Sequence, residues 1–210
     1  MRGRTVTALL VLLAARAPSA AGQSLMLQGI AAHSDHELFG SVGGLGVAAG
    51  ARLGRGDAFL RFQLSRITGT ERRTGIACAG LIWPGTCFEE PLSDHAGMTT
   101  GGLTVSLPVA RRGAVKLAFI TGISLTDASS LTRGLSSGQQ LGASKVMGGI
   151  EGGLETAISP RASLPFSIVV GGSLSRLSPM RRDDVVDGYT PLEYSSTLSR
   201  LWLGIAWFRK

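Results

Sequence analysis

Alternation of apolar with small or polar residues at every second position is the feature that most limits how this chain can fold. Val115, Leu117 and Phe119 alternate with Lys116 and Ala118, for example. A period of two is that of a β-strand with one continuously apolar face. The pattern recurs in eight segments, at roughly 24–33, 42–53, 58–69, 97–109, 114–126, 142–158, 165–176 and 197–208. After residue 15 no apolar run approaches the 18 residues that a membrane helix requires.

The connections between these segments alternate in length. Tight links, rich in Gly, Pro, Arg or Ser, stand at 54–57, 110–113 and 159–164. Long polar links stand near 34–41, 70–96, 127–141 and 177–196. Short turns on one rim and long loops on the other are typical of bacterial outer-membrane barrels, whose apolar band needs roughly ten residues per strand. The sequence therefore predicts an all-β, eight-stranded antiparallel up-and-down transmembrane β-barrel.

The first residues have the pattern of a secretory signal peptide. Arg2 and Arg4 precede an apolar stretch at 6–15, and small residues allow cleavage after either Ala21 or Gly22. We expect residues 1–22 to be removed and residues 23–210 to form the barrel domain. Without the leader's three arginines, 18 basic residues face 14 acidic ones, a net charge of +4. An exported chain with this balance, few aromatic residues and no recognisable module predicts no nucleic-acid partner.

Nearly all of the mature chain resembles the small eight-stranded outer-membrane barrels, the class that includes the OmpX proteins and the membrane domain of OmpA. Alternation over 201–207 ends in the pair Trp207 and Phe208, similar to the C-terminal signal read by the barrel-assembly machinery. Here Arg209 and Lys210 follow, whereas in the family the aromatic residue is commonly the last. The resemblance implies an outer-membrane location, a monomer, assembly by that machinery, and contact with outer-membrane lipids and lipopolysaccharide.

Charges of both signs fall on the inner face once the aliphatic face is assigned to lipid. We expect a lumen charge network of Arg52, Arg61, Lys116, Glu151, Glu155 and Arg200, with Gln63 beside it. An eight-stranded barrel is just wide enough for side chains to fill it, and buried charge is tolerated only when paired. These considerations favour a plugged polar interior over a small pore.

Cys78 and Cys87 are the only cysteines of the chain. In an oxidising compartment a disulfide is the default for two cysteines so close in sequence. It would contribute about 2 to 3 kcal/mol, mostly by restraining one loop.

The three histidines, His33, His36 and His95, lie in or beside the first two long links. Together they could bind zinc or another divalent ion, or one could act as a general base beside Ser34 or Ser93. Their spacing matches no specific catalytic motif, so we expect solvated loop residues, no cofactor and no catalytic residue.

Four arginines lie near the expected outer rim, where lipopolysaccharide phosphates would sit: Arg176, Arg181, Arg182 and Arg200, with Arg133 able to join them. Function is expected to be envelope integrity or surface interaction through the outward loops rather than catalysis. The alternative is a lipid-modifying enzyme at the outer leaflet, like the lipid A palmitoyltransferase, or an ion-binding site at the mouth. A small pore and a soluble lipocalin-like carrier are further alternatives, although a carrier needs an apolar cavity and a polar outside.

Overall fold

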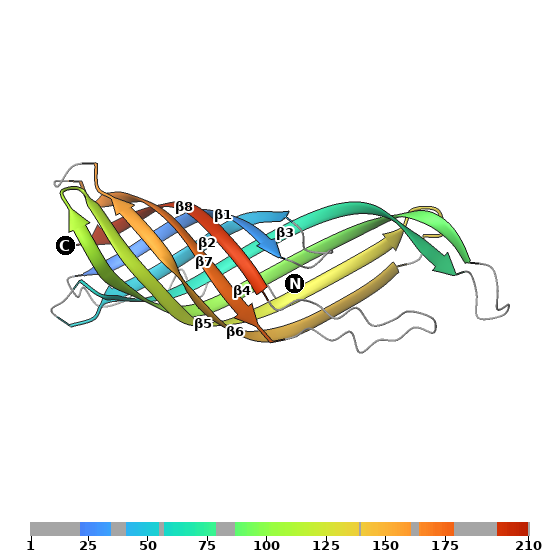
Figure 1. Ribbon diagram of the computed structural model, residues 1–210, viewed down its shortest axis with the longest axis horizontal. Helices are drawn as coiled ribbons and strands as arrows, with labels where there is room; N and C mark the ends of the chain where they lie inside the picture. The colour runs from blue at the N-terminus through green and yellow to red at the C-terminus, as the bar shows by residue number, and fades with distance from the viewer. Residues whose placement is uncertain are drawn as a thin grey trace.

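The structure, a computed structural model, describes residues 22–34, 41–54, 57–78, 87–138, 140–160, 164–178 and 197–209. These ranges form eight strands, β1 (Gln23–Ser34), β2 (Ser41–Arg52), β3 (Phe59–Cys78), β4 (Cys87–Arg112), β5 (Val115–Gly134), β6 (Gln140–Ile158), β7 (Phe166–Leu177) and β8 (Thr197–Arg209). Each strand pairs antiparallel with the next, and β1 pairs with β8 to close the barrel (Figure 1). The predicted eight-stranded antiparallel barrel is confirmed. Within these ranges no helix has the length and apolar character to cross a membrane.

The outward face of the barrel carries large aliphatic side chains. Exposed fractions reach 69% at Leu45, 67% at Leu201 and 64% at Ile150. We call this surface the aliphatic belt; it includes Leu25, Leu27, Leu45, Val47, Leu103, Leu107, Phe119, Ile123, Leu125, Ile150, Leu154, Ile168, Val170, Leu174, Leu201, Leu203 and Ile205. A barrel that is apolar outside and packed with small and polar side chains inside has the pattern of a transmembrane barrel.

Strands β3 to β6 run well beyond the other four and form a sheet that extends to one side of the barrel (Figure 1). We call this part the projection: residues 69–78, 87–97, 127–134 and 140–146. The expected long loops at 70–96 and 127–141 are therefore wrong for most of their length. Leu92, Ala96 and Met98 continue the period of two and are buried on the inner face. Their outward neighbours are polar because the strands have left the aliphatic belt, so the alternation no longer shows an aliphatic face.

Tight turns join the strands at the other end. Gly54 (φ 63°) and Gly113 (φ 57°) have left-handed backbone conformations, which residues with a Cβ rarely adopt. Strand β1 begins and β8 ends at this same end, opposite the projection (Figure 1). We call it the turn rim and the opposite end the outer rim.

Candidate functional site

The middle of the lumen holds a layer of ion pairs that joins distant strands. Arg61 Nη1 of β3 lies 2.6 Å from Glu155 Oε2 of β6. Gln63 Nε2 donates to Glu151 Oε1 at 2.7 Å, and Arg200 of β8 pairs with the other oxygen of Glu151. Both carboxylates are at least 96% buried. The two buried acids therefore have charged or amide partners across the lumen, as buried carboxylates require.

Two other members of the expected network, Lys116 and Arg52, lie closer to the turn rim than the middle layer does. Lys116 Nζ is 3.5 Å from Asp57 Oδ2 and donates to the Asp57 carbonyl at 3.2 Å. Arg52 Nη2 is 4.0 Å from Asp57 Oδ1. Both cations also lie over the Phe59 ring, at 6.0 Å for Arg52 and 5.5 Å for Lys116. The six residues expected to form one network thus form two groups, of which the turn-rim group is built around Asp57.

Apolar clusters lie on both sides of the middle layer. The outer cluster comprises Ile30, Ala32, Val42, Ile67, Ala96, Met98, Ala128, Met147, Leu177 and Leu198. The inner cluster comprises Met26, Ala48, Val169 and Ala206. Along β8, Arg200 lies between Leu198 of the outer cluster and Ala206 of the inner one. The lumen is therefore layered, with charges held between two apolar plugs.

The projection has its own buried carboxylate at Asp94, which is 3% exposed. It accepts hydrogen bonds from Arg73 Nε at 2.6 Å and from Thr132 Oγ1 at 2.5 Å. These partners belong to the strands on either side, β3 and β5. Asp94 therefore links three strands of the projection.

Glu90 makes a similar link between β4 and the turn after β5. Its Oε2 accepts the backbone N–H groups of Ser136 and Ser137, both at 2.9 Å, and its Oε1 accepts the Ser137 hydroxyl at 2.7 Å. The Ser137 hydroxyl and the two N–H groups lower the pKa of Glu90 from its ordinary value of 4.5. Sequence reasoning had placed Glu90 and Asp94 in a loop and so missed both contacts.

The two histidines that the structure describes lie on different strands. His95 is exposed on the outward face of β4, with Nδ1 3.1 Å from Thr70 Oγ1 and Nε2 3.4 Å from Ser93 Oγ. His33 lies on β1, which is separated from β4 by β2 and β3. His36 lies outside the described residues. In the part of the chain that the structure covers, no group of three potential metal ligands is present.

The two cysteines stand directly opposite each other in the register of β3 and β4. Residues directly opposite in an antiparallel pair have Cα atoms about 4.5 to 5.5 Å apart, within the range that a disulfide spans. The side chains of Cys78 and Cys87 lie outside the described part of the structure, so the disulfide stays a prediction.

The arginines of the expected outer rim divide between the two faces. Arg176 is exposed on the outward face near the end of β7, and Arg133 is exposed on the projection. Arg200 faces the lumen, where its partner is Glu151 rather than a lipid phosphate. Arg181 and Arg182 fall outside the described ranges.

No protein-family model and no curated protein matches this chain. Among solved structures it is similar to Neisserial surface protein A, with TM-score 0.51, 12% identity, and 90% of this chain and 98% of that chain covered. It is also similar to a major outer membrane protein of Thermus thermophilus, with TM-score 0.57, 14% identity, and 88% and 98% covered. The attachment invasion locus protein of Yersinia pestis gives TM-score 0.50, 12% identity, and 90% and 99% covered. The resemblance to small outer-membrane barrels is confirmed at the level of the fold.

Proposed function

We propose that this protein is a monomeric outer-membrane barrel that serves envelope integrity or surface interaction, with the projection as its working surface. One observation carries the proposal: the closed barrel has an aliphatic belt outside and a filled lumen inside, and of the strands that the structure describes β3 to β6 alone extend beyond it. A soluble carrier would need the reverse arrangement, with a polar outside. In the outer membrane, the projection then faces the surroundings of the cell.

The order within the projection supports a role in contact with other molecules. Its strands are fixed to one another by the buried contacts of Asp94 and Glu90. A preorganised surface loses less conformational entropy on binding than a mobile loop does. Two of the similar structures are named a surface protein and an attachment invasion protein, which accords with this role.

Heat-modifiability and cell fractionation test the location. A barrel in the outer membrane should be recovered in that membrane fraction and should change its gel mobility on boiling.

Labelling with a maleimide tests the orientation of the barrel, in a variant that carries Cys78→Ser and Cys87→Ser. With an impermeant maleimide on intact cells, Ser129→Cys on the projection should react and Ala114→Cys at the turn rim should not. Recovery in the soluble periplasm, or the reverse labelling pattern, would overturn the proposal.

The filled lumen supports a plug rather than a pore. The charged side chains of Arg61, Glu155, Glu151 and Arg200 meet each other across the lumen, and apolar clusters lie beyond them. Planar bilayer recordings should therefore show no steady conductance, and Glu151→Gln should not create a regular channel. A stable single-channel conductance that Glu151→Gln alters would favour the pore.

The proposal includes the biogenesis that the resemblance implies. Residues 1–22 are removed on export, and the barrel-assembly machinery inserts residues 23–210. N-terminal sequencing of the protein purified from membranes should begin at Gly22 or Gln23. A sequence that begins at Met1 would contradict this part of the proposal.

A lipid-modifying enzyme is the second candidate, because Ser93 Oγ and His95 Nε2 lie 3.4 Å apart on one face of β4, although Ser93 is buried and only His95 is exposed. The other ring nitrogen, Nδ1, faces the Thr70 hydroxyl, and Asp94 is engaged by Arg73 and Thr132 on the opposite face. A serine nucleophile usually needs a base that a third group orients. Mass spectra of lipid A from cells with and without His95→Ala distinguish the candidates, since only an enzyme predicts a change.

A further inference from the structure

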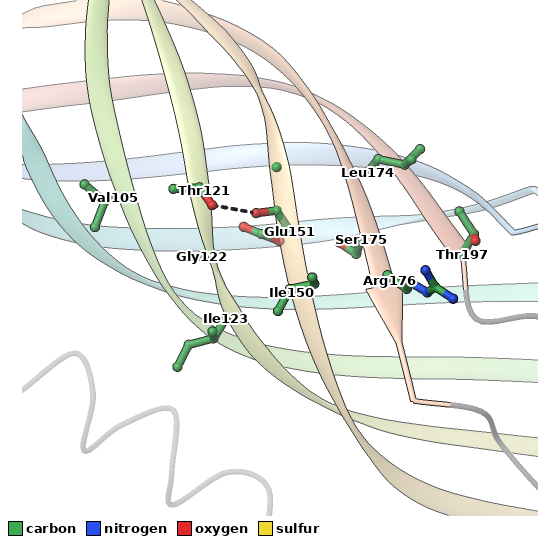
Figure 2. Close-up of a pocket in the computed structure, with 11 residues that line it drawn as sticks. Val105, Thr121, Gly122, Ile123, Ile150, Glu151, Leu174, Ser175, Arg176 and Thr197 are labelled. Atoms are coloured by element: carbon green, nitrogen blue, oxygen red, sulfur yellow. Dashed lines mark hydrogen bonds between the residues drawn. The ribbon is translucent and has the colours of Figure 1, made fainter.

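A groove of about 860 Å³ lies on the outward surface of the barrel, mostly over β5, β6 and β7, with one lining residue each from β4 and β8. Figure 2 shows its lining residues, among them the aliphatic side chains of Val105, Ile123, Ile150 and Leu174. Ile123, Ile150 and Leu174 are each at least 60% exposed and belong to the aliphatic belt. The groove therefore opens toward the membrane interior rather than toward water.

Gly152 is one of the residues that line this groove, and it leaves space there because it has no side chain. Its register partners are Thr121 on β5 and Leu174 on β7, and a Cβ added at Gly152 would come no closer than 4.0 Å to any neighbouring atom. The Thr121 hydroxyl donates to the Glu151 carbonyl at 3.2 Å (Figure 2). That donor is thus satisfied within the protein, as polar groups facing lipid must be. The lining of the groove accordingly suits a hydrocarbon chain.

The outer end of the groove is cationic. Arg176 and Thr197 line it there, and Arg176 stands opposite Ile150 in the register of β6 and β7 (Figure 2). Arg176 is exposed, and no ion pair within the described ranges involves it. A guanidinium at the polar boundary of a membrane can bind a phosphate through two parallel hydrogen bonds.

We propose that this groove binds the lipid A part of lipopolysaccharide, with one acyl chain over Gly152 and a phosphate on Arg176. The position and the charge of Arg176 are the reasons for proposing this lipid. Arg176 is at the outer rim, so the headgroup bound there belongs to the outer leaflet, and the charge requires an anion. The inference rests on the outer-membrane location proposed above, and it names the lipid partner and the site that holds it.

Native mass spectrometry of the full-length barrel, refolded in detergent and titrated with purified lipid A, tests the site directly. Gly152→Leu places a side chain in the groove at a position where a Cβ fits without a close contact, and Arg176→Gln removes the cation. Each should weaken binding of the first lipid A molecule about tenfold. This factor is at the lower end of the affinity loss expected when a charge-assisted hydrogen bond or the burial of an aliphatic group is lost.

Two matched controls lie outside the groove. Gly101→Leu adds a leucine to the outward face of β4, where a Cβ meets nothing within 4 Å. Arg66→Gln removes an exposed outward arginine of β3. Both variants should bind lipid A as the unaltered barrel does.

Three outcomes would overturn the inference. Gly152→Leu and Arg176→Gln could bind lipid A as tightly as the controls do, or phosphatidylglycerol could bind equally well and respond equally to both changes. Alternatively, Gly152→Leu could abolish a dimer while lipid A binding stays constant, which would assign the groove to a second copy of the chain. Because the titration uses refolded protein, its result is independent of cell fractionation. Failure of the lipid site and failure of the outer-membrane location can therefore be told apart.

Discussion

Arg61 and Glu155 lie on strands separated by β4 and β5, yet Nη1 and Oε2 approach to 2.6 Å across the lumen. The Arg61 side chain is 12% exposed and that of Glu155 is 3% exposed. Each charge is thus removed from water and depends on the other for compensation. The pair also fixes the distance between opposite walls of the barrel, which hydrogen bonds between neighbouring strands alone do not define.

Glu155→Leu should lower the free energy of unfolding by about 3 to 5 kcal/mol, because it leaves the buried Arg61 charge unpaired. The double variant Arg61→Met with Glu155→Leu should recover most of that loss, since an apolar pair needs no compensation. Urea titrations in detergent, followed by tryptophan fluorescence, measure both. Arg52→Met is the control: its bridge to Asp57 is 4.0 Å long and partly exposed, so the change should stay below about 1 kcal/mol. A double variant as unstable as Glu155→Leu would contradict this account.

Gly171 and Trp202 face each other in the register of β7 and β8. A Cβ at Gly171 would overlap the Trp202 indole, whereas a Cβ at Gly148 would meet nothing within 4 Å. Gly171→Ala should therefore destabilise the barrel by about 1 to 3 kcal/mol through overpacking, while Gly148→Ala should not. The temperature at which the heat-modifiable band converts on gels reports this difference. Equal conversion temperatures for the two variants would show that the indole moves aside freely.

The barrel could be predicted from the sequence because the alternation that forms its strands is a local property of neighbouring residues. In a strand that separates lipid from a filled lumen, side chains must alternate, so the residues of the aliphatic belt and the inward charges could be assigned from period alone. Leu201 and Arg200 illustrate this, the first 67% exposed and the second 6% exposed. The pattern also predicted that Glu151 and Glu155 would need partners.

Other features depend on geometry that a period does not contain. The ion-pair partner of Glu151 is Arg200 of β8. The register and tilt of the strands decide which of them face each other across the lumen, and neither can be deduced from the alternation of residues. The projection was missed because many of its outward residues, such as Thr70 and Arg72, are polar and interrupt the aliphatic face. In the projection, the remaining signal was the alternation of inward apolar residues such as Leu92 and Ala96. Asp57 joined the turn-rim group unexpectedly, because a turn residue has no face to assign.

Protonation of Glu90 should loosen the turn between β5 and β6. Its hydrogen bonds from Ser137 and Ser136 lower its folded pKa below 4.5, the value it returns to when the turn opens. The stabilisation is therefore present above pH 4.5 and is lost as the pH falls through the lowered folded value. Hydrogen-exchange protection of the Ser136 and Ser137 amides, corrected for intrinsic rates, should drop over that range.

Glu90→Gln should reduce the same protection at neutral pH and remove its dependence on acid. Glu89→Gln provides the matched control, because Glu89 is exposed on the neighbouring position of β4. Protection that falls equally in both variants would mean that general charge, rather than the carboxylate contacts of Glu90, orders the turn.

The predicted disulfide between Cys78 and Cys87, once formed, should restrain the tip of the projection without affecting the barrel. The register places the two residues opposite each other at the last pair of β3 and β4, far beyond the aliphatic belt. Its contribution of about 2 to 3 kcal/mol therefore falls on local opening of the hairpin. Reduction, or the double variant Cys78→Ser with Cys87→Ser, should accelerate proteolysis between 79 and 86 about tenfold or more and leave the heat-modifiability temperature unchanged. Maleimide should label Cys87 in Cys78→Ser but neither cysteine in the untreated protein. Two reactive thiols in protein isolated from the outer membrane would show that the tip is held by strand pairing alone.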